Sequence, residues 1–376
     1  MKTVKYLLAF FFVFLAVSVC GCSYSAKTSA EKAIKKDLDL LKNLDSETTM
    51  KYISYQELFP DSDDNTELSD DIKEVFSLFF QNFDYKILDV NVDKDKQSAQ
   101  ANLRLVTLDA HALAEDFSKA QLKHEISQSA SSEEATEQTI SLEERYTLLN
   151  ELLKSNDYQT VERNCTISLD ASDKDGETSW EIRRTNTLEN DLVGGLMNDL
   201  TDPDILSPED TILVYLNTLK NMSAEELGNY LNADSIISTE DPAKISLAEA
   251  LVKQVHSTFD YSIGETTVSG YTATVTANIT TFDSDAILEN YQKELDTYLA
   301  SVDAVIDGAQ KRYEKSYSLL LEYIEENTAT KTVETTFTLI NDGASWKLED
   351  AGTVFGQALF GTLSSSPVED KQETNG

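Results

Sequence analysis

Histidine is the side chain most often used for metal binding and for acid–base catalysis near neutral pH, and this chain has only three. None lies at a spacing from another histidine or a cysteine that would form a zinc site: His111, His124 and His256. A glycine-rich phosphate loop and a nucleophile elbow are also missing from the sequence, which has 13 glycines. The residues therefore predict no catalytic group, no cofactor and no metal ion.

Two acidic segments have some of the ligands of a calcium site. Asp173-Lys174-Asp175-Gly176 matches part of a calcium loop, but the first and twelfth ligand positions are Ala171 and Ile182. A similar turn occurs at the corresponding position later in the chain, and it favours a plain hairpin over a calcium site at residues 173–176. Asp61-Ser62-Asp63-Asp64-Asn65 is a denser acidic loop, and we expect it to be solvated, with weak extracellular calcium binding as the alternative.

Cys165 is the one cysteine beyond residue 22. It alternates with polar neighbours in Val161 to Leu169, and this period of two places its thiol on the buried face of a strand. A reactive thiol needs an electropositive and partly exposed setting. We therefore expect an inert core cysteine.

The start of the chain has the layout of an export signal. Lys2 and Lys5 precede the apolar run Tyr6 to Val19. The run has about 14 residues, fewer than the roughly 20 that span a bilayer as a helix. A permanent transmembrane anchor is therefore not expected.

The end of this segment, Val19-Cys20-Gly21-Cys22, resembles the lipobox of bacterial lipoproteins. The resemblance implies cleavage before Cys22, acylation of that cysteine with lipid such as palmitate, and a place on the outer face of the cell membrane. Cys20 is the rival acceptor, because Val17-Ser18-Val19 also precedes a cysteine. A soluble secreted protein is the alternative to both.

The charge of the chain limits its partners. Loss of residues 1–21 removes two lysines, so 31 − 2 = 29 basic residues face 67 acidic ones and the net charge is 29 − 67 = −38. Repulsion from phosphate excludes nucleic acid and opposes contact with anionic lipid headgroups. We expect the folded part to stand off the membrane on residues 22–28.

The remaining sequence repeats once. Four motifs recur in the same order, at offsets that fall from 178 through 176 to 166, which indicates a duplication with small deletions. The pairs are Leu41-Lys42-Asn43-Leu44 with Leu219-Lys220-Asn221-Met222, Phe83-Asp84-Tyr85 with Phe259-Asp260-Tyr261, Ala101-Asn102-Leu103 with Ala277-Asn278-Ile279, and Trp180 with Trp346.

Hydrophobic spacing predicts the same elements in each copy: helices, two strands, a helical insertion, a hairpin and a closing helix. In the second copy the insertion covers Ser284 to Asn327, and we expect it to fold back near Asp307-Gly308. In the first copy two shorter helices are expected around the polar linker Ser127 to Thr139. The predicted helix starts are a proline-containing cap at Ser207-Pro208 and capping boxes of Ser223 with Glu226 and Ser246 with Glu249.

This order, with a tryptophan just after the last hairpin turn, resembles the NTF2-like (cystatin-like) domains of Firmicute lipoproteins, many of unknown function. The resemblance implies an α+β fold of two tandem domains, each with helices packed on a curved antiparallel sheet, and a Gram-positive surface location. It implies no reaction. The expected domains are the signal peptide 1–21, the anchor and linker 22–28, the repeats 29–203 and 204–363, and a polar tail 364–376.

Four polar residues recur in the predicted strands. Some NTF2-like relatives use buried carboxylates inside their conical fold, here called the cone, which makes candidates of Asp84, Asp260, Asn102 and Asn278. All four fall on the polar side of the strand alternation, opposite the residues that should face the helices. We expect roles on the sheet surface or in an interface, including an internal pseudo-dimer of the two outer sheet faces.

Together these features predict a lipid-anchored, extracytoplasmic and non-enzymatic module that holds an apolar ligand or contacts another envelope protein. The alternative is an enzyme that acts on a small or lipid-like substrate inside one cone. A catalytic cone requires a buried ionisable pair, whereas a binding cone is apolar or is filled by its own side chains.

Overall fold

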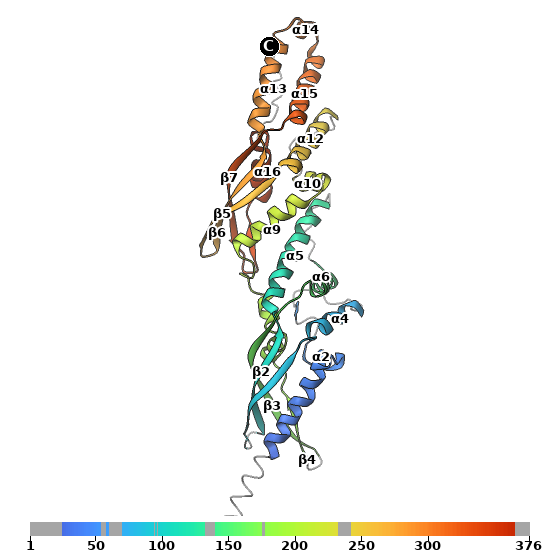
Figure 1. Ribbon diagram of the computed structural model, residues 1–376, viewed down its shortest axis with the longest axis vertical. Coiled ribbons are helices and arrows are strands. Elements are labelled where there is room, and N and C mark those ends of the chain that lie inside the picture. The colour runs from blue at the N-terminus through green and yellow to red at the C-terminus, as the bar shows by residue number, and fades with distance from the viewer. Residues whose placement is uncertain are drawn as a thin grey trace, which may run out of the picture. The chain divides into compact units, whose positions relative to one another are not determined.

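The computed structural model describes residues 25–53, 58–59, 70–93, 95, 97–131, 140–174, 177–231 and 242–364 (Figure 1). Cys20, Cys22, the rest of the expected signal peptide 1–21, the acidic segment 61–65 and residues 365–376 lie outside these residues. The chain forms two compact units. The first contains the described residues up to Ser118 together with 140–202, and the second contains 119–131 together with those from Pro203 onward.

The first unit combines helices with one antiparallel sheet. A helix over residues 25–42 comes first. The further elements are α2 (Ser46–Tyr52), α4 (Asp70–Phe79), β1 (Asp84–Asp93), β2 (Ser98–Leu108), α5 (Ala110–Ser131), α6 (Leu142–Ser155), β3 (Thr160–Lys174), β4 (Glu177–Ile182), α7 (Asn186–Leu192) and α8 (Leu196–Asp199). The strand order is β1-β2-β3-β4, with every neighbour antiparallel.

The second unit repeats this plan. Its elements are α9 (Pro208–Asn221), α10 (Ala224–Tyr230), α12 (Pro242–Thr258), β5 (Asp260–Ser269), β6 (Thr272–Phe282), α13 (Ser284–Leu299), α14 (Val302–Ile306), α15 (Ala309–Glu326), β7 (Thr330–Asn341), β8 (Trp346–Leu348), α16 (Ala351–Phe360) and a 3-10 turn (Gly361–Ser364). Its sheet has the order β5-β6-β7-β8, again antiparallel. The predicted α+β class is confirmed.

Matching strand irregularities support the duplication. In each unit the first strand shifts register against the second, between Ile87 and Asp89 in β1 and between Ile263 and Thr266 in β5. A bulge bends a strand and increases its twist, so both edge strands curve at the same place in the repeat.

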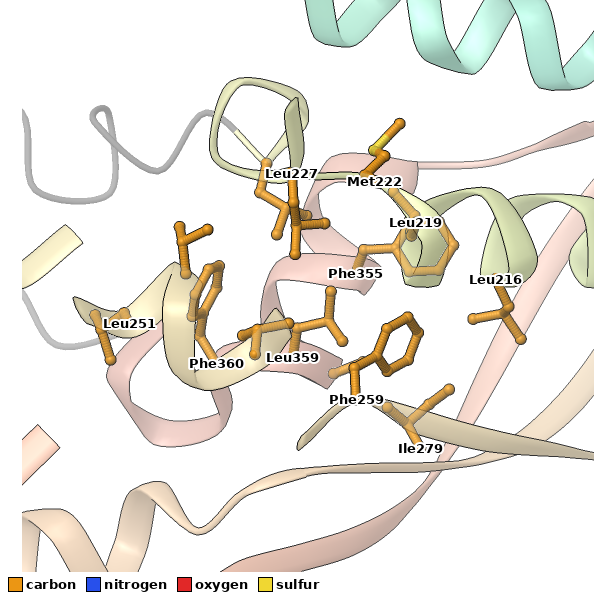
Figure 2. Packing of buried hydrophobic residues seen from close by; sticks show 14 of the residues in the cluster. Leu216, Leu219, Met222, Leu227, Leu251, Phe259, Ile279, Phe355, Leu359 and Phe360 are labelled. Carbon is orange, nitrogen blue, oxygen red and sulfur yellow. The ribbon is translucent and has the colours of Figure 1, made fainter. Parts of the chain in front are cut away.

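The buried face of the second sheet and the helices enclose one apolar core. Figure 2 shows Leu216 and Leu219 of α9, Ile279 of β6 and Leu359 of α16 directed into the same interior. The alternate residues Ala273, Val275, Ala277 and Ile279 of β6 are all buried, as a strand with one covered face requires.

Helix α5 belongs to both units. Leu113 in its N-terminal half is buried with the first unit, whereas Ile126 and Ala130 in its C-terminal half are buried in the core of the second. The sequence predicted a polar linker from Ser127, and this was wrong for residues 127–131, which are helical. Residues 119–131 thus lie in the second unit, although the expected boundary placed them in the first repeat.

The helix starts agree in part with the sequence patterns. Ser207 caps α9 with Pro208 in the first turn, and Ser223 with Glu226 forms the predicted capping box of α10. The second predicted box is wrong, because α12 begins at Pro242 and Ser246 lies inside it. In the insertion the break at Asp307-Gly308 is present, but a second break at Ala300-Ser301 separates off the short helix α14.

Candidate functional site

The repeated aspartates connect the first long helix of each unit to the edge strand of its sheet. Lys42 Nζ lies 2.7 Å from Asp84 Oδ1, and Lys220 Nζ lies 2.7 Å from Asp260 Oδ1. The hydrogen bond from each lysine holds the pKa of its aspartate below the ordinary value. Both carboxylates are more than half exposed, so they lie at the surface and outside the apolar interior.

The next residue of each strand adds a second link to the same helix. The Tyr85 hydroxyl donates to Asp39 Oδ1 at 2.7 Å, and the Tyr261 hydroxyl donates to Asn217 Oδ1. Burial raises the pKa of both tyrosines, and at Tyr85 the bond to Asp39 raises it further. The lysine–aspartate pair and the tyrosine hydrogen bond form what we call the helix–strand bridge, and each unit has one.

A polar groove of about 380 Å³ lies beside the bridge of the first unit, between the helix over residues 25–42 and β1. Two ion pairs line this groove. Lys27 Nζ lies 3.3 Å from Asp89 Oδ1, and the second pair is Lys42 with Asp84. Leu88, displaced by the bulge, adds an exposed apolar side chain. Ion pairs across a groove hold its two walls together, so this groove is explained by the contacts between the helix and β1.

The other polar candidates lie apart from one another. Asn102 of β2 is exposed and accepts a hydrogen bond from Thr166 at 3.0 Å, and Asn278 of β6 is also exposed. Asp173 and Lys174 pair with β4 in the predicted hairpin. Cys165 is buried on β3, and burial, with the nearby Asp191 carboxylate, raises the pKa of its thiol, so it stays protonated.

The histidines are also scattered. His111 and His124 both lie on α5. The Nδ1 atom of His111 is 3.7 Å from Asp199 Oδ1, and the Nε2 atom of His124 is 2.7 Å from Gln128 Nε2. His256 lies in the last turn of α12. Across the described part of the chain, no three His, Cys, Asp or Glu side chains gather where they could hold a metal ion.

Apolar side chains make up most of the described interior of both units, together with several buried threonines, Ser284, Asn341 and Glu189. Among the almost completely buried residues that the structure describes, Glu189 is the only charged one, and Arg184 pairs with it. A void of about 10 Å³ beside Phe76 and Leu113 is no larger than one water molecule needs. The described interior therefore contains no pair of carboxylates of the kind used in acid–base catalysis.

The most exposed apolar side chains gather at the turn of the α13–α15 hairpin. Of the large hydrophobic residues described, four expose more than 70% of their surface, and three of these lie in α14. Val302 exposes 74%, Val305 81% and Ile306 75%, and the neighbouring Leu299 exposes 49%. We call these four residues the apolar tip.

Hydrogen bonds connect the apolar tip to the helices on either side of it. Ser301 caps α14, and Ala304 between the exposed residues is buried. Arg312 of α15 donates to the Ala304 carbonyl oxygen at 3.1 Å, and the Tyr298 hydroxyl of α13 donates to Asp307 at 2.9 Å. The turn is therefore fixed to both long helices.

This tip was not predicted from the sequence. The pattern was present, since Val302, Val305 and Ile306 have the spacing of one helix face beside the predicted turn. It was included in one long helical stretch, because the break at Ala300-Ser301 was not predicted.

No family model matches the sequence, and no curated protein matches it. Among solved structures, a Bacillus subtilis chain described as a lipoprotein is matched over 74% of this chain and 96% of its own, with 13% sequence identity. The TM-score of 0.25 is too low for this likeness to support a fold or a function.

None of the helices that the structure describes combines the length and the apolar character needed to cross a membrane.

Proposed function

We propose that this chain is a lipid-anchored, extracytoplasmic module of tandem NTF2-like domains that acts through its surface and catalyses no reaction. Acylation of Cys22 would hold it at the outer face of the cell membrane. The support for the anchor is the sequence around it: two lysines, an apolar run too short to span a bilayer, and Val19-Cys20-Gly21-Cys22.

The observation that carries the surface role is the filled interior. The described helices and sheets enclose mainly apolar side chains, and Glu189, the one charged residue buried among them, is paired with Arg184. A binding cone needs a cavity of several hundred Å³ for a small molecule, with a few polar groups that orient it. Of the two binding modes predicted from the sequence, contact with a macromolecular surface is therefore favoured over an enclosed apolar ligand.

Metabolic labelling with an alkyne fatty acid tests the anchor. We expect labelling of the wild-type chain, loss of labelling in Cys22→Ala and retention in Cys20→Ala. Labelling that survives Cys22→Ala and disappears in Cys20→Ala would move the anchor to Cys20. An unlabelled wild-type chain would contradict lipid anchoring.

Thermal unfolding of the unacylated mature chain tests the filled interior. A ligand that binds only the folded state raises the unfolding temperature with its concentration. We expect a soluble fatty acid to leave the transition unchanged. A saturable rise would restore the enclosed-ligand mode and contradict the surface role.

A further inference from the structure

We infer that the apolar tip of the second unit inserts into the interfacial layer of a lipid bilayer, as a contact separate from the acyl anchor. The inference rests on the proposed function only in that it requires a membrane nearby. The tip itself contains no acylated residue, so it can be tested on a chain without lipid.

The tip directs its apolar side chains to one side. At 100° per residue, Val305, Val302 and Ile306 span an arc of about 100° on α14, and Ala304 lies opposite, buried against the hairpin. Asp303 lies at the flank of that arc. Three exposed aliphatic side chains on one face, in a turn fixed to its neighbours, are already arranged for burial in an apolar medium.

The polar groups near the tip suit a bilayer interface. An unsatisfied backbone group is costly in an apolar medium. Here the Ala304 carbonyl oxygen accepts from Arg312, and the Ala304 N–H donates to Ser301. Tyr298 flanks the tip, and tyrosine and arginine are residues that anchor at the membrane–water interface.

Size and shape disfavour a protein partner. A stable protein interface needs about 800 Å² from each side, or roughly 20–30 residues. The tip is a single convex turn with four exposed apolar residues. A second copy would add repulsion, because the chain has a net charge of −36. A bilayer requires neither a large area nor a complementary pocket.

Charge permits the contact at this place. Residues 296–315 contain four acidic and three basic side chains, a net charge of 3 − 4 = −1. Asp307 is partly neutralised by Lys311, 3.7 Å away, and hydrogen-bonded by Tyr298. The tip is therefore nearly neutral within a strongly acidic chain, which favours zwitterionic over anionic headgroups.

Vesicle binding by the full mature chain, unacylated through Cys22→Ala, tests the inference. Val305→Trp places an indole at the tip, and the two native tryptophans are buried and supply a constant background. With phosphatidylcholine vesicles we expect a blue shift of the added indole and quenching by brominated lipid. Phosphatidylglycerol vesicles should bind more weakly, and added salt should reduce that difference by screening the repulsion.

A matched control uses the turn between β5 and β6, where Tyr271 and Val268 are also exposed. The double variant Val305→Ser/Ile306→Ser should lower the vesicle partition coefficient at least tenfold, and Val268→Ser/Tyr271→Ser should leave it unchanged. No shift of the indole introduced by Val305→Trp would overturn the inference. So would equal loss in both double variants, or self-association abolished by the tip variant in the absence of vesicles.

These outcomes are separate from those of fatty-acid labelling. A chain that is labelled at Cys22 but does not insert its tip keeps the proposed function and loses the inference. A chain that inserts its tip without being labelled does the reverse.

Discussion

The two units share a helix–strand bridge and differ in what lies between their second and third strands. Lys42, Asp84 and Tyr85 repeat as Lys220, Asp260 and Tyr261. The lysine–aspartate pair is the same in both units, whereas the tyrosine donates to Asp39 in the first and to Asn217 in the second. The first insertion instead sends α5 into the core of the second unit, and the second insertion ends in an exposed apolar tip. The repeated residues therefore serve the fold, and the properties specific to each copy lie in its insertion.

The largest expected effects lie along α5, where two buried side chains should stabilise different units. Leu113→Ala should destabilise the first unit and Ile126→Ala the second, each by about 2–5 kcal/mol, because each leaves a cavity in a packed core. Urea unfolding followed by tryptophan fluorescence can separate them, since Trp180 lies in the first unit and Trp346 in the second.

Single-tryptophan chains, carrying Trp180→Phe or Trp346→Phe, provide the two reporters. If Ile126→Ala shifted only the transition reported by Trp180, the C-terminal half of α5 would belong to the first unit and the comparison between the insertions would fail. Leu113→Ala measured with both reporters is the matched control.

The tyrosine hydrogen bond of the helix–strand bridge should stabilise the first unit slightly more than the second. Tyr85 donates to a carboxylate and Tyr261 to an amide, and hydrogen bonds to charged groups are the stronger kind. We expect Tyr85→Phe to lower the free energy of unfolding by about 1.5 kcal/mol and Tyr261→Phe by about 0.5–1 kcal/mol. Both values lie in the lower part of the usual ranges because both sites are partly exposed. Midpoints of urea unfolding measure both.

Exchange of the acceptors sharpens this prediction. In a chain with Asp39→Asn and Asn217→Asp, the order of the two tyrosine effects should reverse. Equal effects in both backgrounds would show that the carboxylate adds nothing. Burial and the bond to Asp39 raise the pKa of Tyr85 in the folded state, so its contribution to stability should be fully present below pH of about 10, the unfolded value, and be lost as pH rises through the folded pKa.

Local patterns in the sequence were sufficient for elements whose residues explain them alone. The cap at Ser207, the capping box at Ser223 and the alternation in β6 depend on neighbours within a few positions, and each was found. The extension of α5 was missed, because Ile126 is buried by side chains of the second unit and its polar neighbours resemble a linker. The partners of Asp84 and Asp260 depend on tertiary contacts with a helix about 40 residues earlier.

The apolar tip should contribute little to stability, in contrast to the buried residue beside it. Val302→Ser and Val305→Ser should each change the free energy of unfolding by less than about 0.5 kcal/mol, as exposed substitutions usually do. Ala304→Asp should expose the hairpin amides to faster hydrogen exchange, because it buries an unpaired charge. Strong destabilisation by Val305→Ser would mean that the tip is part of the fold and would weaken the case for a binding surface.

The smallest expected effect is the acid titration of the two bridge aspartates. Their folded pKa lies below the unfolded value of about 3.9, because Lys42 and Lys220 donate to the charged carboxylates. A lowered pKa stabilises the fold above the unfolded value, and the stabilisation is lost as pH falls through the folded pKa. NMR titration of the carboxyl carbons should show both values lowered, with Lys42→Gln raising the pKa of Asp84 alone and Lys220→Gln that of Asp260 alone. If only one aspartate responded, the bridge would be a property of one copy, and the repeated sequence around it would need another explanation.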